Sequence, residues 1–349
     1  MSWLPHAAKR AEPHGTGPRP ATPARELFEN AAGYRNAAMT KWDETAVPDQ
    51  SGRTVLITGA NSGLGLRSAR VLASRGARVL LGCRDPERGK QAAERIEGSA
   101  HVQPEVVELD LAELSSVREA ASRVRERTGD RLDVLMNNAG VMATPFRTTA
   151  DGFELQFGTN HLGHAALTWL LMPALRGGRH SRVVTLSSLA HHGNGLDTTD
   201  PNFRRRRYSP LRAYSQSKLA NLLFSRELDS RIRSAGLDIT SAAAHPGMTD
   251  TELAPNSARQ RTVPGFVGDV VSKGNSLITQ RVELGALPQL YAATAPNVAG
   301  GDYFGPARLA ETRGHPKRAG LNPAARNDTS AARLWQITEE LTGISPDPC

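Results

Sequence analysis

Short apolar runs alternate with amphipathic stretches along most of this sequence. Six runs rich in β-branched and other apolar residues predict buried strands, and the stretches between them place apolar residues at helical spacing, as in residues 64–74. Alternating strands and helices are typical of a doubly wound sheet. We therefore expect an α/β fold, a single domain with a seven-stranded parallel sheet flanked by helices. The predicted strands occupy residues 54–58, 78–83, 105–109, 132–136, 182–187 and 239–244.

A glycine-rich turn follows the first predicted strand directly. It reads Gly59-Ala60-Asn61-Ser62-Gly63-Leu64-Gly65 and runs into a helical stretch. The first glycine permits a sharp turn, the second lets the backbone approach a diphosphate, and the third lets the helix pack closely on the strand. The helix N-terminus then faces the anion. Strand, turn and helix predict the dinucleotide site of a Rossmann domain, whereas the glycines alone would also fit an ordinary strand-to-helix connection.

Arg84, the residue after the second predicted strand, lies where a dinucleotide fold selects its cofactor. An acid at this place binds the ribose 2′-hydroxyl, and an arginine pairs with a 2′-phosphate. Asp85 is also near, but Pro86 and Glu87 follow it, which is the signature of a helix N-cap. Arg84 therefore predicts NADP(H) in preference to NAD(H).

Asp110 and Leu111 follow the third predicted strand. At this place the carboxylate of Asp110 would reach the adenine amino group of a bound nucleotide. An equally good interpretation is that Asp110 caps the helix that runs through Val117. The sequence leaves both roles open.

Tyr214 and Lys218 are the strongest candidates for catalysis. Four positions apart on a helix, they project from the same face. Lysine is also rare here, because arginine supplies most of the 43 Lys and Arg side chains. A phenol has a reference pKa of about 10, and a fixed ammonium nearby would lower it. The pair predicts an acid/base centre, although an amphipathic helix with a half-buried Tyr214 and an exposed Lys218 has the same pattern.

With Asn137-Asn138-Ala139-Gly140 after the fourth predicted strand, the sequence resembles the short-chain dehydrogenase/reductase family over residues 52–310. In that family the pattern Thr-Gly-x-x-x-Gly-x-Gly, here Thr58 to Gly65, binds the cofactor. The pattern Asn-Asn-Ala-Gly steadies the sheet and lines the cofactor site. Tyr-x-x-x-Lys performs catalysis with an upstream Ser. The resemblance thus implies cofactor contacts from Thr58, Asn138, Ala139, Gly140, Tyr214 and Lys218.

The resemblance implies two further catalytic residues, Ser188 and Asn160. Side chains alternate along a strand, so only one hydroxyl of Ser187-Ser188 would face the site. The family pattern selects Ser188, which hydrogen-bonds the substrate oxygen and the phenol of Tyr214. Asn160 resembles a family Asn whose main-chain carbonyl holds a water that links Lys218 to solvent. Together these groups would form a proton path.

Residues 245–251 resemble the segment of the family that closes over the nicotinamide. They read His245-Pro246-Gly247-Met248-Thr249-Asp250-Thr251. Pro246 and Gly247 would line the cofactor site, Thr251 fits the position that contacts the carboxamide, and Thr249 is close enough to compete. Residues 249–285 would form a mobile lid that chooses the substrate.

Finer features resemble retinol dehydrogenases and protochlorophyllide reductases. They include Cys83-Arg84-Asp85, Asn160-His161-Leu162-Gly163-His164, and the 25 residues between Ser188 and Tyr214. Those enzymes use NADP(H) and bulky apolar substrates. The resemblance implies an NADP(H)-dependent oxidoreductase acting on a lipophilic aldehyde or ketone, or on the corresponding alcohol. The alternatives are reduction of a conjugated carbon–carbon double bond and a non-catalytic role as a dinucleotide sensor or scaffold.

Composition narrows the compartment and the partners. Cys83 and Cys349 give no disulfide framework, and no apolar run is long enough to span a membrane, so we expect a cytoplasmic protein. The histidines accompany no acid or Cys pattern with ligand spacing, so no metal is expected. The net charge is +8 and residues 204–207 are all arginine, but no aromatic pattern surrounds them. They predict a solvated loop, not a nucleic-acid site.

The ends of the chain differ from its middle. Residues 1–38 are rich in Pro, Ala, Gly, Arg and His without periodicity, and we expect disorder there. Met39 opens a more protein-like sequence, so an upstream-start artefact is the alternative. We expect the Rossmann domain at 39–310 and a C-terminal extension at 311–349, whose short helix near 330–341 follows a surface stretch at 308–326. Family precedent favours a homodimer or homotetramer through the helices of Asn160 and Tyr214.

Overall fold

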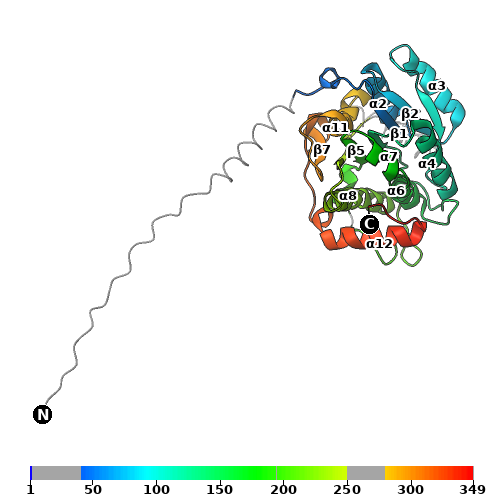
Figure 1. Cartoon of the computed structure of the whole chain (residues 1–349). Helices are drawn as coiled ribbons and strands as arrows, with labels where there is room; N and C mark the ends of the chain where they lie inside the picture. Colours follow the sequence, from blue (N-terminus) through cyan, green and yellow to red (C-terminus); the bar gives the residue numbers. More distant parts are fainter. Residues whose placement is uncertain (2–40, 194, 250–279, 349) are drawn as a thin grey trace, which may run out of the picture.

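Eight strands form a single sheet in the described part of the chain (Figure 1). They are β1 Thr54–Thr58, β2 Arg78–Cys83, β3 Glu105–Glu108, β4 Val134–Asn137, β5 Ser181–Leu186, β6 Ile239–Ala244, β7 Tyr303–Arg308 and β8 Arg313–Arg318. Their order across the sheet is β3-β2-β1-β4-β5-β6-β7-β8. All neighbours from β3 to β7 pair in parallel, and β8 is an antiparallel edge strand. The predicted doubly wound α/β fold is confirmed.

The structure, a computed structural model, describes residue 1 and residues 41–193, 195–249 and 280–348. Two groups of expectations lie outside these residues. One is the extension at 1–38, of which only Met1 is described. The other is Thr251, with most of the expected lid at 249–285. Both stay predictions.

All six predicted strands are present, with ends that differ by at most two residues. The predicted count of seven is wrong, because β8 adds an eighth, antiparallel strand. The sequence of β8, Arg-Gly-His-Pro-Lys-Arg, has no apolar alternation, so the hydrophobic pattern gives no sign of it. Pro316 is tolerated because β8 lies at an edge. The turn from β7 to β8 contains residue 310, the expected end of the Rossmann domain.

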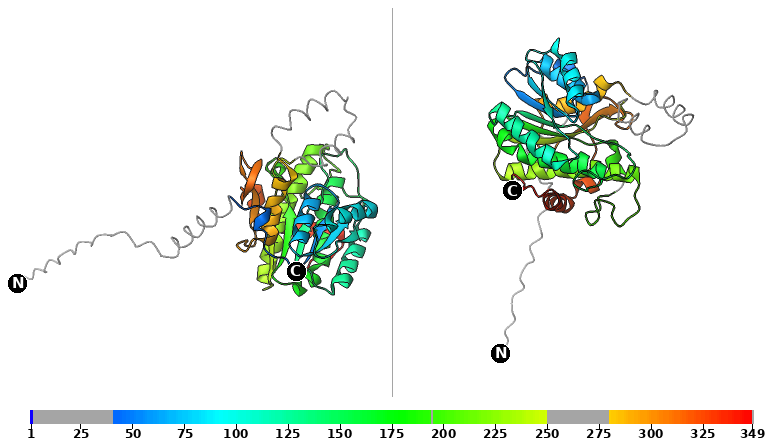
Figure 2. Two further views of the ribbon diagram at one scale, coloured as in Figure 1. Left: turned by 90° about the horizontal axis from the view of Figure 1, so that it is seen from above. Right: turned by 90° about the vertical axis from the view of Figure 1, so that its right-hand side faces the viewer.

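Helices cover both faces of this sheet (Figure 2). They are α2 Gly63–Ser74, α3 Pro86–Glu97, α4 Leu114–Thr128, α5 Leu155–Phe157, α6 Gly163–Leu170, α7 Met172–Gly177, α8 Pro210–Ser234, α11 Val282–Thr294 and α12 Asp328–Thr342. Alternate side chains of β1 point to opposite faces: Val55 and Ile57 pack with α2, α3 and α11, whereas Leu56 packs with α4, α6, α7 and α8. None of the described helices is both long and apolar enough to cross a bilayer.

The strand order reverses between β1 and β4. From β1 the sheet continues to β2 and β3, and from β4 it continues in the other direction to β5 and β6. In a doubly wound sheet a crevice opens at the carboxyl ends of the strands at this point, and nucleotides bind there. Thr58 ends β1 and Asn137 ends β4. The glycine-rich turn and the Asn-Asn-Ala-Gly segment therefore meet at the crevice.

Helix α12 packs on α8 at the outside of the domain (Figures 1 and 2). The ring of Trp335 stacks on that of Phe224 of α8, with centroids 5.6 Å apart, and meets that of Trp169 of α6 edge-on at 4.9 Å. All three side chains are buried. The predicted C-terminal helix is thus present and occupies part of the surface of α8. A family-like dimer through the helix of Tyr214 stays a prediction, and it would have to share α8 with α12.

Removing the indole of Trp335 tests the packing of α12. We expect Trp335→Ala to lower the free energy of unfolding by about 3–5 kcal/mol, because it leaves a cavity beside the rings of Phe224 and Trp169. Glu339→Ala, at an exposed position of α12, is the control and should change it by less than about 0.5 kcal/mol. Urea unfolding followed by tryptophan fluorescence gives both values. Equal midpoints for the two variants would contradict the packing described.

Candidate active site

The glycine-rich turn packs β1 against α2 as tightly as the sequence predicts. Gly59 has a φ of +65°, which glycine adopts without strain. A Cβ on Gly65 would lie 2.4 Å from the carbonyl oxygen of Gly59 and 2.6 Å from Nδ2 of Asn138, so only glycine fits there. Ser62 is the N-cap residue of α2, but its hydroxyl makes no capping hydrogen bond. The first N–H groups of α2 therefore have no side-chain cap and are suited to an anion. The turn is completed by Ala60, Asn61, Gly63 and Leu64.

Thr58 joins the end of β1 to the segment after β4. Its hydroxyl oxygen accepts hydrogen bonds from the backbone N–H groups of Asn138 and Ala139, both at 2.9 Å. In return, Nδ2 of Asn138 donates to the carbonyl oxygen of Thr58 at 2.7 Å. The other side-chain atom of Asn138, Oδ1, is buried and has no hydrogen-bond partner among the described residues. These hydrogen bonds fix the two sides of the crevice relative to each other and leave Oδ1 of Asn138 as a buried acceptor.

His164 of α6 extends this connection toward Asn160. Its Nδ1 lies 2.9 Å from the carbonyl oxygen of Asn160, and its Nε2 lies 2.9 Å from Oγ1 of Thr58. A carbonyl oxygen only accepts, so Nδ1 carries the hydrogen and Nε2 accepts the hydroxyl hydrogen of Thr58. Burial lowers the pKa of His164 to about 4, and the charge of Lys218 acts in the same direction. His164 is therefore a neutral link between the crevice and Asn160.

Asn160 lies in a single π-helical turn, Gly158–Leu162, and its side chain is held on two sides. Oδ1 accepts from the N–H of Val141 at 2.8 Å, and Nδ2 donates to the carbonyl oxygen of Val141 and to Oγ of Ser217, both at 2.9 Å. A Cβ on Gly140 would lie 3.2 Å from Oδ1 of Asn160 and 3.4 Å from Nζ of Lys218. Gly140, Asn160 and Lys218 therefore converge, and π-turns of this kind are frequent at functional sites.

Ser188, Tyr214 and Lys218 come together at the carboxyl end of β5. Lys218 donates from Nζ to the carbonyl oxygen of Leu186 at 3.2 Å, and this Nζ lies 5.8 Å from the ring centre of Tyr214. The hydroxyl of Ser188 lies near the phenol of Tyr214 and acts on it in the direction that lowers its pKa. The other serine of the pair, Ser187, is buried and donates to the carbonyl oxygen of Lys218 at 2.8 Å. Of the two hydroxyls, that of Ser188 is the one beside the phenol.

The pKa of Tyr214 moves in the direction opposite to the one expected. Burial raises it, and the nearby hydroxyl of Ser188 offsets only part of this effect. The expected lowering by Lys218 is wrong for this structure, because Tyr214 is almost fully buried and the ammonium is directed to the carbonyl of Leu186. Burial also lowers the pKa of Lys218 to about 8. The phenol is thus protonated at neutral pH, next to a lysine that is mostly charged.

The candidate contacts to the adenosine half of the cofactor follow strands β2 and β3. Arg84 is exposed after β2, and Asp85 caps α3 as predicted: its carboxylate accepts from the backbone N–H groups of Glu87 and Arg88. Asp110 does not cap α4, so that interpretation is wrong. Its Oδ1 accepts from the N–H of Ala112 at 2.9 Å, while the N-cap residue of α4 is Glu113. A cavity of about 270 Å³ brings predicted residues together; its lining includes Arg84, Asp110, Glu113 and Ser116.

Leu111 and the residues after β6 complete the predicted cofactor contacts. Leu111 is buried, and its carbonyl oxygen would lie 2.4 Å from a Cβ on Gly163, so α6 packs closely against it. Pro246 and Gly247 follow β6, whose neighbour β5 leads to Ser188. Thr249 donates from its hydroxyl to the carbonyl oxygen of Pro246 at 2.8 Å. Only Thr251 lies outside the described residues.

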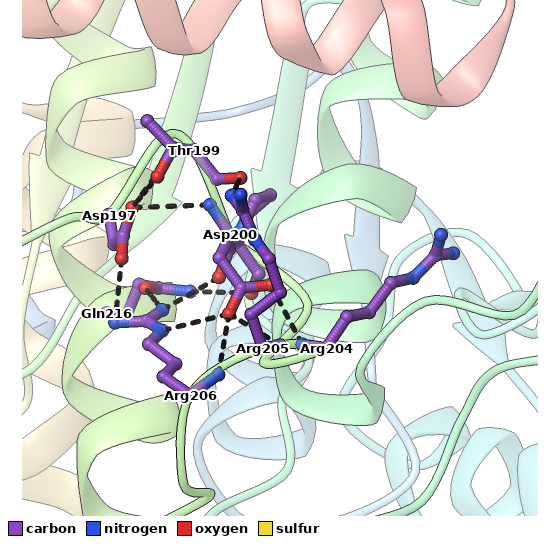
Figure 3. Close-up of polar contacts among 8 residues, drawn as sticks. Asp197, Thr199, Asp200, Arg204, Arg205, Arg206 and Gln216 are labelled. Atoms are coloured by element: carbon purple, nitrogen blue, oxygen red, sulfur yellow. Dashed lines mark hydrogen bonds and ion pairs between the residues drawn. The ribbon is translucent and has the colours of Figure 1, made fainter.

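The arginine run before α8 is braced by Asp200 (Figure 3). The carboxylate of Asp200 accepts the backbone N–H groups of Arg204, Arg205 and Arg206 at 2.8–3.2 Å. The guanidinium of Arg206 turns inward and donates to Oε1 of Gln216, which lies between Tyr214 and Lys218 on α8. The predicted solvated loop is therefore right for the exposed Arg204, Arg205 and Arg207, and wrong for Arg206. This residue ties the loop to α8.

Sequence reasoning missed His164, His245 and Glu311. It gave the two histidines no individual role beyond the motifs that contain them. Among the described residues no three His, Cys, Asp or Glu side chains are grouped to hold a metal ion. The spacing of His164 from Asn160, one helical turn, was the available signal for the first. Glu311 gives no such signal, because a turn far along the chain brings it to His245.

Comparison with known proteins gives one consistent result. A family model described as short chain dehydrogenase matches residues 53–262. Human retinol dehydrogenase 13 is 41% identical over 300 residues, which cover 84% of this chain and 85% of that protein. The crystal structure of an uncharacterised Mycobacterium paratuberculosis protein has 42% identity and a TM-score of 0.71, covering 87% of this chain and 98% of that one. A Beutenbergia cavernae dehydrogenase structure with bound NADP has 26% identity and a TM-score of 0.56, covering 73% and 96%.

Acid should destabilise this protein through its buried histidines. Burial lowers the pKa of His161 to about 3 and that of His164 to about 4, so both stay neutral in the folded chain. The unfolded chain binds their protons below about pH 6.5. The free energy of unfolding should therefore fall as pH falls from about 6.5 toward 4, by up to about 1.4 kcal/mol per pH unit for each histidine.

Urea unfolding at several pH values between 7 and 5 measures this slope, since most carboxylates of the unfolded chain begin to titrate at lower pH. The matched variant His164→Gln should show a shallower slope over the same range. A stability that does not change from pH 7 to pH 5, or an unaltered slope in the variant, would contradict a buried neutral His164.

Proposed function

The chain belongs to the short-chain dehydrogenase family of oxidoreductases, and on that premise we propose that it transfers hydride between NADP(H) and the carbonyl or alcohol carbon of a lipophilic substrate. One observation carries the proposal: the phenol of Tyr214 lies beside the hydroxyl of Ser188 and the ammonium of Lys218, at the carboxyl edge of the sheet. This is the edge where the crevice between β1 and β4 opens.

The residues at the crevice fit a dinucleotide. The close packing at Gly65 lets α2 begin directly behind the turn, and its first N–H groups have no side-chain cap. Oδ1 of Asn138 is a buried acceptor that receives no hydrogen bond from the residues the structure describes. Thr58 to Gly65, Asn138 to Gly140 and Pro246, Gly247 and Thr249 would hold the cofactor, which supplies the hydride when bound. The NADP in the Beutenbergia cavernae relative supports this assignment.

A preference for NADP(H) over NAD(H) rests on Arg84 and Asp85. An acid that binds the 2′-hydroxyl of the adenosine ribose is the usual mark of NAD. Asp85 is the cap of α3, and its Oδ1 accepts both N–H groups that it caps. Arg84 is exposed beside it, with no ion-pair partner among the described residues. A guanidinium in this place would pair with the 2′-phosphate of NADP(H).

In the reductive direction Tyr214 would donate its phenolic proton to the substrate oxygen. Burial raises its pKa, so the phenol carries the proton at neutral pH, as a general acid must. Ser188 would orient the same oxygen, because its hydroxyl already lies at the phenol. The ammonium of Lys218 would stabilise the phenolate that remains. Asn160 would support proton resupply through its carbonyl oxygen, which also accepts the hydrogen of Nδ1 of His164.

The substrate class follows from the relatives. Human retinol dehydrogenases 13 and 12 are named for an apolar alcohol, and the first is 41% identical to this chain. We propose a lipophilic aldehyde or ketone, or the corresponding alcohol, as substrate. The proposed chemistry places the reacting oxygen between Ser188 and Tyr214 and leaves recognition of the apolar part to the surrounding surface.

Substitution of Tyr214 tests the catalytic assignment. We expect Tyr214→Phe to lower kcat for the reduction of a medium-chain aldehyde about 10²–10⁴-fold, because it removes the proton donor. NADPH affinity should change by less than about twofold, since the variant keeps the aromatic ring. The absorbance of NADPH gives the rate. Tyr291→Phe is the matched control, because the hydroxyl of Tyr291 in α11 donates to Oδ1 of Asn297, outside the proposed site. Full activity of Tyr214→Phe would refute the assignment.

Substitution of Arg84 tests the cofactor preference. We expect Arg84→Ala to weaken NADPH binding about 10–150-fold, the loss of one charged hydrogen-bonded pair, and to leave NADH binding unchanged. Fluorescence titration of the wild type and the variant with both nucleotides measures this. Arg95→Ala, an exposed arginine near the other end of α3, is the control and should bind both nucleotides as the wild type does. Equal weakening for NADH and NADPH would show that Arg84 does not read the 2′-phosphate.

A further inference from the structure

The turn between β7 and β8 has an unusual backbone. Leu309, Ala310 and Glu311 have φ values of +48°, +50° and +66°, in the left-handed region that residues other than glycine rarely adopt. Such a conformation persists where the surroundings fix it, and it is common beside functional sites. The turn is held by Thr312, whose N–H and hydroxyl donate to the carbonyl oxygen of Leu309, and by the carboxylate of Glu311.

Glu311 turns its carboxylate inward from this turn. Oε2 lies 3.2 Å from Nε2 of His245, and Oε1 accepts from Nζ of Lys317 at 3.1 Å and from the N–H of Gly320 at 3.0 Å. Burial alone would raise the pKa of Glu311, but these hydrogen bonds together lower it to about 2. The side chain of His245 is fully buried, and that of Glu311 is only 13% exposed. Glu311 is therefore a buried anion directed at His245.

The hydrogen bonds of His245 define which of its nitrogens carries the hydrogen. Nδ1 lies 3.2 Å from the backbone N–H of Gly247, which can only donate, so Nδ1 is the acceptor. Nε2 then carries the hydrogen and donates it to the carboxylate of Glu311. Burial lowers the pKa of His245, which keeps the ring neutral despite the nearby carboxylate. A continuous series of hydrogen bonds thus runs from Glu311 through His245 to the amide of Gly247.

The rest of the hairpin holds the same segment. The N–H of Met248 donates to the carbonyl oxygen of Thr312 at 2.9 Å, and a Cβ on Gly247 would lie 2.4 Å from that oxygen. Gln280 donates from Nε2 to the carbonyl oxygen of Pro246 at 2.6 Å and accepts from the N–H of Gly314 at 3.0 Å. Residues 246–248 are thus clamped between β6 and the β7–β8 hairpin.

We propose that Glu311, acting through His245, is a positioning residue that fixes the backbone of Pro246 and Gly247 for the nicotinamide half of the cofactor. The inference rests on the proposed function, in which this segment lines the cofactor site. It adds a residue from the C-terminal hairpin to a site otherwise built from β1, β4, β5 and α8. It also gives the strained turn a role: the left-handed backbone at Glu311 aims the carboxylate into the domain.

Three variants test the hydrogen bonds from Glu311 to His245 and from His245 to Gly247 separately. Glu311→Ala removes the acceptor of His245, and Glu311→Gln keeps a neutral acceptor at the same place. His245→Asn keeps an acceptor for the amide of Gly247 but loses the donor to Glu311. Leu309→Asn is the matched control, because Leu309 is 67% exposed in the same turn and Asn tolerates a positive φ.

Amide hydrogen exchange without nucleotide is the first readout, alongside urea unfolding. In Glu311→Ala and in His245→Asn, exchange at Gly247 and Met248 should rise at least tenfold while the urea midpoint stays near that of the wild type. Glu311→Gln should recover most of the protection, and Leu309→Asn should behave as the wild type. The double variant, Glu311→Ala with His245→Asn, should exchange no faster than either single variant, because both substitutions break the same series of hydrogen bonds. Unchanged exchange at Gly247, or effects that add in the double variant, would overturn the inference.

NADPH titration is the second readout and separates the two proposals. Glu311→Ala should weaken NADPH binding about tenfold and raise the KM for NADPH more than it lowers kcat, with partial rescue in Glu311→Gln. Wild-type binding of NADPH together with undiminished binding by Glu311→Ala would overturn the positioning role alone. A wild type that binds no NADPH would instead overturn the proposed function, whereas the exchange result would still decide whether Glu311 fixes Gly247.

Discussion

The hydroxyl of Thr58 is the contact on which the site depends. The strand order reverses between β1 and β4, so the sheet itself leaves a crevice at the ends of these strands. Thr58 closes the base of that crevice by accepting two backbone N–H groups from Asn138 and Ala139, and it can do so because its own hydrogen goes to His164. Through the ring of His164 the same contact reaches Asn160 and the catalytic helix. One buried hydroxyl therefore sets the position of the glycine-rich turn relative to the proposed acid/base centre.

Burial is the second constraint, and it acts on the titratable groups around the proposed acid/base centre and on His245. It raises the pKa of Tyr214, lowers that of Lys218 to about 8, and keeps His164 and His245 neutral. In such a medium each histidine has a defined tautomer, since the other partner of each ring is a backbone group with a fixed role. The result is a set of hydrogen bonds that is rigid before a cofactor arrives, which is what precise hydride transfer requires.

The sequence predicted correctly the features that depend on neighbouring residues, such as strands, a helix cap and a glycine-rich turn. The apolar runs predicted strands β1 to β6, Asp85 followed by Pro86 predicted the cap of α3, and the spacing of the glycines predicted the close packing at Gly65. Features set by distant contacts were missed or wrong. The edge strand β8 has no apolar pattern, and the pKa of Tyr214 follows from burial by the whole domain. Asp110 is a local exception, because it accepts from the N–H of Ala112 in its own turn and does not cap α4. Glu311 meets His245 because β7 pairs in parallel with β6, which places the turn after β7 beside the segment after β6.

Transfer of a labelled hydride tests the central claim most directly. The protein would be incubated with NADPH deuterated at C4 of the nicotinamide and with a conjugated lipophilic aldehyde, and the product analysed by mass spectrometry and NMR. Our account predicts an alcohol with deuterium on the former carbonyl carbon. Deuterium on a former alkene carbon, now saturated, would mean reduction of the conjugated double bond. NADPH binding without any transfer, over a panel of aldehydes and ketones, would contradict the proposed chemistry and favour a nucleotide sensor.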